Sequence, residues 1–212
     1  MDIIGTIFSF KAAQFVSIYV TLLALVNPFQ KIFVMLSLSP QLKEHESRYI
    51  AVKSNVVALV ILLLFLALGN VIFTYIFNIN LYAFRITCGF VLLYNGFIAL
   101  QEGVLIKIDP NTRLNDVAAV PIALPMIAGP GTITAAVTFP HQEGVVVTII
   151  AILAVISTNM LIMLYAKYLG AFLNRFNLLS PLIRILGLII ATVGVQMCFN
   201  GIKEFLDVIG IV

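Results

Sequence analysis

Long apolar segments recur along the whole chain, and short polar or turn-forming stretches separate them. A bilayer core about 30 Å thick requires about 20 residues of helix. Six segments reach that length, and they cover residues 11–37, 52–77, 81–101, 117–139, 145–169 and 181–206. The pattern therefore predicts an all-α membrane protein with six transmembrane helices.

Composition agrees with this class of protein. Of the 212 residues, 62% are hydrophobic and 10% are charged, whereas about 25% of the residues of a typical soluble domain are charged. The connections are too short to hold a separate soluble domain, so residues 1–212 are predicted to form a single membrane domain. No basic block indicates nucleic-acid binding, and the two cysteines lack the spacing of a metal or redox pair.

Two of the segments are interrupted near the middle, at Asn27-Pro28 and, 102 residues later, at Gly129-Pro130-Gly131. Proline removes an N–H donor, and its ring clashes with the carbonyl four residues before it. Backbone groups freed in this way are tolerated at membrane depth only where protein or a water-filled cavity surrounds them. Paired breaks in corresponding places of two chain halves are typical of the substrate site of a transporter.

Glycines of the third and sixth segments repeat with a constant offset of 98 residues: Gly89, Gly96 and Gly103 correspond to Gly187, Gly194 and Gly201. A spacing of seven residues is almost two helical turns, so each triplet marks one helix face that a neighbour can approach closely. Together with the breaks, the offset predicts two three-helix repeats, residues 1 to about 105 and about 115 to 212, whose first helices, spans 1 and 4, are discontinuous. Because three is odd, the repeats would be inverted in the membrane. Independent packing glycines are the alternative.

Each break would begin a half-helix whose first N–H groups have no partner inside the helix. The positive end of the helix dipole lies there as well, which favours a carboxylate. The substrate site is therefore predicted at Asn27, Pro28, Gly129, Pro130, Gly131 and Thr132. The alternative is a proline kink filled by a neighbouring helix.

Three further polar residues lie within apolar segments. Asn55 and Thr158 occupy similar places in the second and fifth segments, and both are predicted to line the same site, with interhelical hydrogen bonds as the alternative. Lys31 lies one turn after Pro28. We expect its ammonium to reach toward the cytoplasmic interface, with binding of an anionic group as the alternative.

All nine acidic residues and both histidines fall in connections or at segment ends. Proton relays use intramembrane carboxylates or histidines, so a carboxylate-driven proton antiporter is disfavoured. A membrane enzyme would need a nucleophile with a base, or a metal cluster. The sequence shows neither within the segments, so we expect no enzymatic activity, no metal and no cofactor.

Four motifs, in their order along the chain, resemble the MarC family of bacterial and archaeal integral membrane proteins. They are Ala24 to Pro28, Phe84-Arg85-Ile86 with Gly89, Val120 to Pro125 running into Ala128 to Thr132, and Arg184 to Gly187 with Asn200 to Lys203. The resemblance covers essentially the whole chain and implies six spans in the cell membrane. Some related archaeal proteins, called SnatA, transport small neutral amino acids such as glycine and alanine.

The chain departs from the family pattern just after the first break. Family members commonly have a glycine and a second proline there, where this chain has Gln30 and Phe33. The first half-helix could therefore be straighter than in its relatives, which makes the inherited substrate preference less direct.

These observations favour a secondary transporter of small neutral amino acids that works by alternating access, with its zwitterionic substrate at the two breaks. The substrate carboxylate would lie at the half-helix N-termini, and its ammonium near backbone carbonyls or Asn55. A channel and a structural membrane protein without transport are the alternatives. The expected partners are a small amino acid and the lipid bilayer; the sequence leaves the oligomeric state open, a homo-oligomer included.

Lysine and arginine predict the orientation, because cytoplasmic loops carry the excess of these residues. One side has Lys43, Arg48, Lys53, Lys107, Arg113, Lys167, Arg175 and Arg184, and the other has Lys11, Arg85 and Lys203. Both termini should therefore lie outside, in the periplasm or the extracellular space. A reporter fused to the C-terminus is expected to give an extracytoplasmic signal, and a cytoplasmic signal would contradict this orientation.

Overall fold

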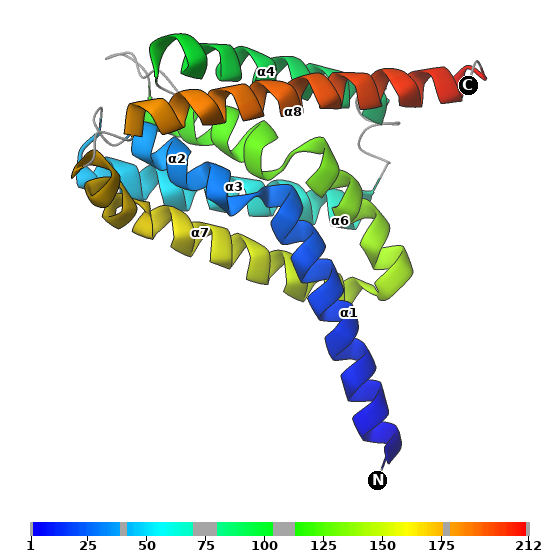
Figure 1. The fold of residues 1–212 in the computed structure, drawn as a ribbon. Coiled ribbons are helices and arrows are strands. Elements are labelled where there is room, and N and C mark those ends of the chain that lie inside the picture. Colours follow the sequence, from blue (N-terminus) through cyan, green and yellow to red (C-terminus); the bar gives the residue numbers. More distant parts are fainter. Residues whose placement is uncertain (1, 39–41, 70–79, 104–112, 176–178, 211–212) are drawn as a thin grey trace.

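The computed structural model describes residues 2–38, 42–69, 80–103, 113–175 and 179–210, and every regular element in these ranges is a helix. Figure 1 shows the helices side by side as a bundle. In chain order they are α1 (Asp2–Val26), α2 (Pro28–Leu38), α3 (Glu44–Leu68), α4 (Leu81–Glu102), α5 (Leu114–Val117), the irregular segment η3 (Ala118–Ile127), α6 (Pro130–Glu143), α7 (Val145–Arg175) and α8 (Leu179–Val208).

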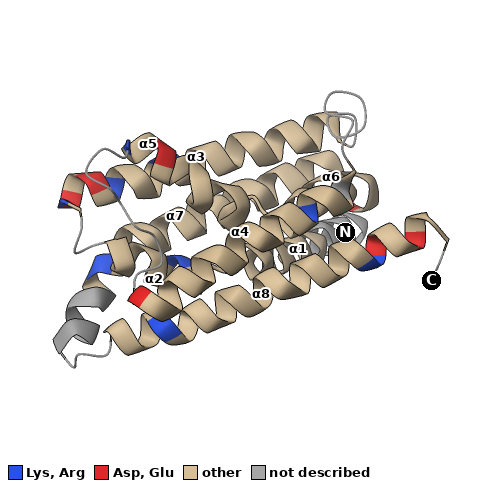
Figure 2. Ribbon diagram, turned by 90° about the horizontal axis from the view of Figure 1, so that it is seen from above, with Lys and Arg blue, Asp and Glu red and all other residues tan. Residues whose placement is uncertain are grey.

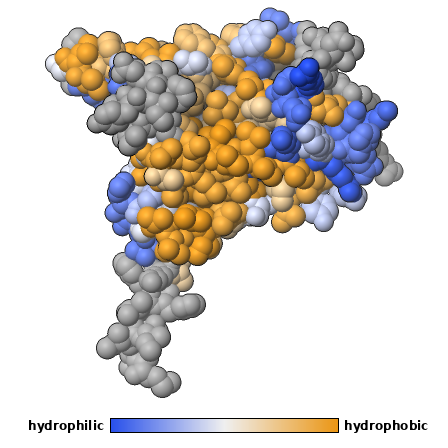
Figure 3. Space-filling view, turned by 180° about the vertical axis from the view of Figure 1, so that it is seen from behind, coloured by the Kyte–Doolittle hydropathy of each residue, from blue (hydrophilic) through white to orange (hydrophobic). Residues whose placement is uncertain are grey.

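The predicted all-α membrane class is confirmed in its coarse form. Five helices are long and apolar enough to cross a membrane, and a sixth is added if the bent pair on either side of residues 128–129 counts as one span. Large apolar side chains such as Val60, Phe90 and Val146 are more than half exposed. Figure 3 shows one face on which hydrophobic residues form a broad area with hydrophilic residues gathered at an end, and Figure 2 shows most charges near the ends of helices. Such a surface suits a lipid environment.

The first two long helices begin earlier than the apolar pattern predicts, and α1 begins at Asp2 rather than at residue 11. The second segment was expected from residue 52, whereas α3 begins at Glu44. The backbone N–H of Lys43 donates to Glu46 Oε2 at 2.7 Å, and the N–H of Ser47 donates to Lys43 O at 3.0 Å, so a polar first turn is capped locally. The expected end of this segment, over residues 70–77, lies outside the described residues.

The glycine triplets lie where α4 and α8 pack against each other. A Cβ built on Gly96 would lie 2.6 Å from Gly187 O, and one built on Gly194 would lie 2.6 Å from Gly89 O. Because Gly89 meets Gly194 while Gly96 meets Gly187, the two helices run in opposite directions, as Figure 1 also shows. Their backbones approach more closely than any larger residue at these positions would permit.

The remaining helices form a second group around α7. This long helix contacts α1, α2, α3 and α6, and α3 also packs against η3. The interior of this group is mostly apolar, with Leu22, Val34, Leu62 and Ile152 almost completely buried. At the first break, Val26 and Pro28 are buried whereas Asn27 and Phe29 are exposed, so one side of the break packs against other helices and the other side is open.

Replacing Gly96 by leucine should destabilise the protein by about 2 kcal/mol or more, because overpacking forces backbone shifts. Ala191 N lies only 2.5 Å from the position of the new Cβ, so the strain falls on backbone rather than on a flexible side chain. Thermal unfolding in detergent measures the effect. The control is Phe90→Leu on the exposed face of the same helix, which is expected to change stability by no more than about 0.5 kcal/mol. Equal unfolding midpoints for the two variants would contradict the close packing.

Candidate functional site

The first helix break is a single residue wide. Asn27 has a φ of +49°, in the left-handed region, between the end of α1 at Val26 and the start of α2 at Pro28. Asparagine is among the few residues that tolerate this conformation. The N–H of Asn27 still donates to Leu23 O at 2.9 Å, and its own carbonyl accepts from Gln30 N at 3.1 Å. The break therefore ends one helix and begins the next without a loop.

The second break is wider. α6 begins at Pro130, after Ala128 and Gly129 have left helical geometry, and the two segments that flank the break meet at 59°. The hydroxyl of Thr132 donates to Ile127 O at 3.0 Å and lies 2.9 Å from Gly129 O. The side chain of the new half-helix thus satisfies a carbonyl that the break releases.

The irregular backbone before the second break extends further than the sequence prediction. Val120 and Leu124 have extended conformations with φ of −132° and −125°, and the peptide bonds that follow them are cis. Both precede prolines, Pro121 and Pro125, and a residue before proline is biased away from the helical region. The signal was present in the sequence, but the prediction of a helix from residue 117 up to the break did not use it.

A cavity of about 570 Å³ lies between the two breaks. Residues from both sides of each break line it, together with a face of α8 that lies next to the face carrying its glycine contacts. The polar lining residues are Asn27, Gln30, Arg85, Thr132 and Asn200, and apolar residues include Leu25, Met126, Leu186, Ile190 and Val193. Arg85 forms an ion pair with Glu204 at 3.1 Å. The cavity therefore combines an apolar wall with a few polar groups at the broken backbone.

Five of the predicted site residues line this cavity: Asn27, Gly129, Pro130, Gly131 and Thr132. Pro28 is buried at the first position of α2 and is not among the lining residues. The structure thus brings together the backbone of both breaks, although they are about a hundred residues apart in sequence.

The other two predicted residues lie elsewhere. Asn159 donates to Asn55 Oδ1 at 2.8 Å, and Asn55 donates to Ala51 O at 2.7 Å, with both asparagines fully buried between α3 and α7. Thr158 Oγ1 is 3.0 Å from the hydroxyl of Tyr19 and does not line the cavity either. Both residues make the interhelical hydrogen bonds that were the alternative to substrate contact.

The expectation for Lys31 is wrong. Its side chain is completely buried and does not reach toward an interface. The ammonium donates to Val26 O at the end of α1 and to Met126 O before the second break, at 2.5 and 2.7 Å, and to Gln30 Oε1 at 3.1 Å. Met126 is 95 residues from Lys31 in sequence, so no local pattern could have indicated this contact.

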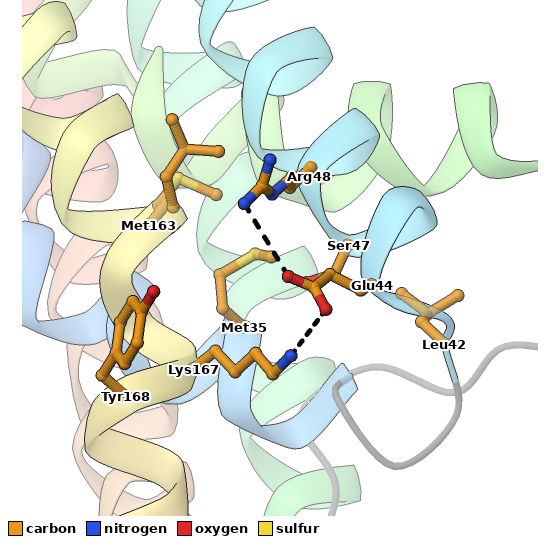
Figure 4. Close-up of a pocket in the computed structure, with 9 residues that line it drawn as sticks. Met35, Leu42, Glu44, Ser47, Arg48, Met163, Lys167 and Tyr168 are labelled. Atoms are coloured by element: carbon orange, nitrogen blue, oxygen red, sulfur yellow. Dashed lines mark hydrogen bonds and ion pairs between the residues drawn. The ribbon is translucent and has the colours of Figure 1, made fainter.

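A smaller hollow of about 220 Å³ lies at the polar ends of α3 and α7. There, Glu44 pairs with Lys167 at 2.8 Å and with Arg48 at 3.7 Å, and Figure 4 shows both basic side chains turned toward the carboxylate. All three side chains are more than half exposed, and exposed ion pairs contribute about 0–1 kcal/mol. The larger cavity is the stronger candidate site, because freed backbone groups border it.

Within the ranges that the structure describes, no group of three or more His, Cys, Asp and Glu side chains could hold a metal ion. The groups of the cavity that could bind a ligand are therefore mainly backbone groups. The first N–H groups of a helix have no partner inside it, and two helices, α2 and α6, begin beside the same cavity. Chemically, this arrangement can bind a carboxylate.

Alanine at position 27 should reduce stability by about 1 kcal/mol, since a Cβ without a polar group is unfavourable in the left-handed region and the helix cap is lost. Glycine at the same position should cost only a few tenths of a kcal/mol. Thermal unfolding of Asn27→Ala and Asn27→Gly in detergent compares the two. If alanine were tolerated better than glycine, the positive φ of Asn27 would not describe the protein in solution.

Comparison with known proteins agrees with this description. The chain is 35% identical to the UPF0056 membrane protein PH0214 of Pyrococcus horikoshii, over 85% of this chain and 89% of that protein. It is 30% identical to a UPF0056 membrane protein of Aquifex aeolicus, over 91% of this chain and 94% of the other. No solved structure gave a significant match. The model of the MarC family of integral membrane proteins matches residues 12–206, so the chain belongs to this family and is a multi-pass integral membrane protein.

Proposed function

We propose that this protein is a secondary transporter of small neutral amino acids of the glycine and alanine type. The observation that carries the proposal is the cavity of about 570 Å³ between the breaks at Asn27 and Gly129, with the N-terminal turns of α2 and α6 at its border. The substrate carboxylate binds at these turns, where N–H groups and the positive ends of two helix dipoles converge. Neither an enzymatic reaction nor a cofactor is part of the proposal.

The polar side chains of the cavity fit a zwitterion better than a cation. Arg85 contributes a positively charged side chain from α4, and its partner Glu204 is not among the lining residues. The amide oxygens of Gln30 and Asn200 accept from Lys31 and Gln196 at 3.1 and 2.9 Å, and each has a second lone pair that can accept from a substrate ammonium. The substrate size, small and neutral, follows from the family resemblance.

The contacts between α4 and α8 support two inverted repeats. The Gly89–Gly194 contact becomes the Gly187–Gly96 contact when each residue is shifted by the offset of 98 residues. In the same way, the approach of Gly103 to Ser180 corresponds to that of Gly201 to Tyr82. A two-fold axis between two related halves produces such pairs of equivalent contacts.

Alternating access follows from this arrangement. In transporters built from inverted repeats, one repeat rocks against the other around a fixed site near the bilayer midplane. Here the discontinuous spans 1 and 4 are α1 with α2, and α5 and η3 with α6, and the cavity lies between their breaks. Both termini are outside the cytoplasm in this proposal, as the distribution of basic residues predicts.

Replacing Gly131 by leucine should abolish transport and leave membrane insertion intact. A Cβ at this position meets only Leu25 Cδ2, at 3.1 Å, so the larger side chain projects toward the cavity rather than into backbone. The measurement is uptake and exchange of radiolabelled glycine in proteoliposomes, with wild-type exchange expected to saturate.

The matched control is Val60→Leu, which enlarges an exposed side chain on α3 far from the lining residues and should retain wild-type uptake. Normal glycine uptake by Gly131→Leu would exclude this site. Flux through the wild type that fails to saturate would indicate a channel, and no flux of any small amino acid would favour a structural role.

A further inference from the structure

The buried ammonium of Lys31 lies between the two helix breaks, and all its contacts are with neutral oxygens. Its three recorded acceptors are Val26 O, Met126 O and Gln30 Oε1. A lysine ammonium has three N–H donors, so each donor has an acceptor. None is left for a carboxylate in the cavity, which argues against a direct role of Lys31 in substrate binding.

Both backbone carbonyls that Lys31 contacts lie at the end of a helical segment, just before a break. Val26 is the last residue of α1, and the N–H of Gln30, four residues further on, donates to Asn27 O instead. Four residues after Met126 stands Pro130, which has no N–H, so neither carbonyl has its usual helical donor. The last carbonyls of a helix have no hydrogen-bond donor inside the helix, and they carry the negative end of its dipole. Buried and unpaired, each would cost about 1–3 kcal/mol.

A comparison of the two breaks shows what the lysine adds. At the second break, the Thr132 hydroxyl donates to Ile127 O, five residues back, just as Lys31 donates to Val26 O, five residues back. A hydroxyl has only one hydrogen to donate, and it serves its own break. The ammonium of Lys31 serves its own break and also reaches across to Met126 O in the other.

We propose that the Lys31 ammonium is a built-in monovalent cation that occupies a carbonyl site between the two breaks and joins them. Carbonyl oxygens released by broken helices coordinate free cations in other membrane proteins built from discontinuous helices. In this chain the cation is covalently attached, so the site is filled without a solute ion. Removal of the ammonium would leave a vacant site for a small cation with N–H donors.

The variant Lys31→Ala, combined with propylammonium, tests this site. Alanine lacks three carbon atoms and the ammonium of lysine, and propylammonium supplies the same atoms. Gln30 and Met126 line the cavity, so the vacated space adjoins a region open to small solutes. The purified variant is expected to unfold about 5 °C or more below the wild type. Propylammonium chloride should raise this midpoint saturably, while the midpoint of the wild type should not change.

Two controls separate a specific cation site from general effects. Tetramethylammonium chloride has the same charge but no N–H donor, and it should not restore stability at equal concentration. Lys31→Met keeps most of the side-chain volume without the charge; it should be less stable than the wild type and unresponsive to propylammonium. A wild-type midpoint for Lys31→Met, or equal stabilisation of Lys31→Ala by the two salts, would overturn the proposal.

If Lys31→Ala cannot be recovered in monodisperse form, its purification in propylammonium and in tetramethylammonium gives the same comparison. Recovery only in propylammonium supports the cation site, and recovery in neither counts against it. The measurement is thermal and needs no substrate. Failure of the proposed transport function would appear as absent glycine flux through the wild type, and it would leave the outcome of this experiment unchanged.

Discussion

The need to satisfy backbone polar groups away from water governs this structure. Hydrocarbon offers no hydrogen-bond partner, so a helix that stops within the membrane must find partners in the protein or in a cavity. At each break, the carbonyl groups that end one helix and the N–H groups that begin the next are satisfied in different ways. The freed carbonyls have protein donors: Lys31 for Val26 and Met126, and Thr132 for Ile127. At the starts of α2 and α6, Phe29, Gly131 and Thr132 line the cavity, and their N–H groups have no acceptor inside their own helix. Acceptors are therefore consumed inside the protein, while donors remain on the side where a ligand would bind.

The packing of α4 on α8 gives this cavity a firm wall. Gly187 and Gly194 turn one face of α8 to α4, where the glycines leave no space for a Cβ. On another face of the same helix, Leu186, Ile190 and Val193 line the cavity, at spacings of four and three residues that keep them on one side. One helix thus carries two functions on two faces. The close backbone contact fixes α8, and this fixes the position of the cavity wall relative to the breaks.

Much of the architecture could be predicted from the sequence, because it depends on local patterns. Segment length and hydropathy identified the long helices, and the prolines preceded by asparagine or glycine are the first residues of α2 and α6. What could not be predicted depends on which helix faces which. Asn55 binds Asn159, 104 residues away, and this contact removes it from the cavity. Lys31 likewise has a distant partner in Met126. An isolated polar residue in an apolar helix has the same appearance in sequence whether it faces a ligand, another helix or a freed carbonyl.

Because the freed carbonyls have protein donors while the N–H groups border the cavity, the site favours one ligand charge over the other. The helix N-termini that border the cavity favour a carboxylate over a free cation, and the cationic residue that lines the cavity, Arg85, is paired with Glu204. If the breaks had instead left their carbonyls open, the same geometry would favour metal cations. The lysine that fills the carbonyl side therefore also determines the sign of the side that stays open. Among the described residues, no carboxylate lines the cavity, so under the proposed function a ligand ammonium would have only neutral oxygens to contact, and the carboxylate end of a zwitterion would be held more strongly than its ammonium end.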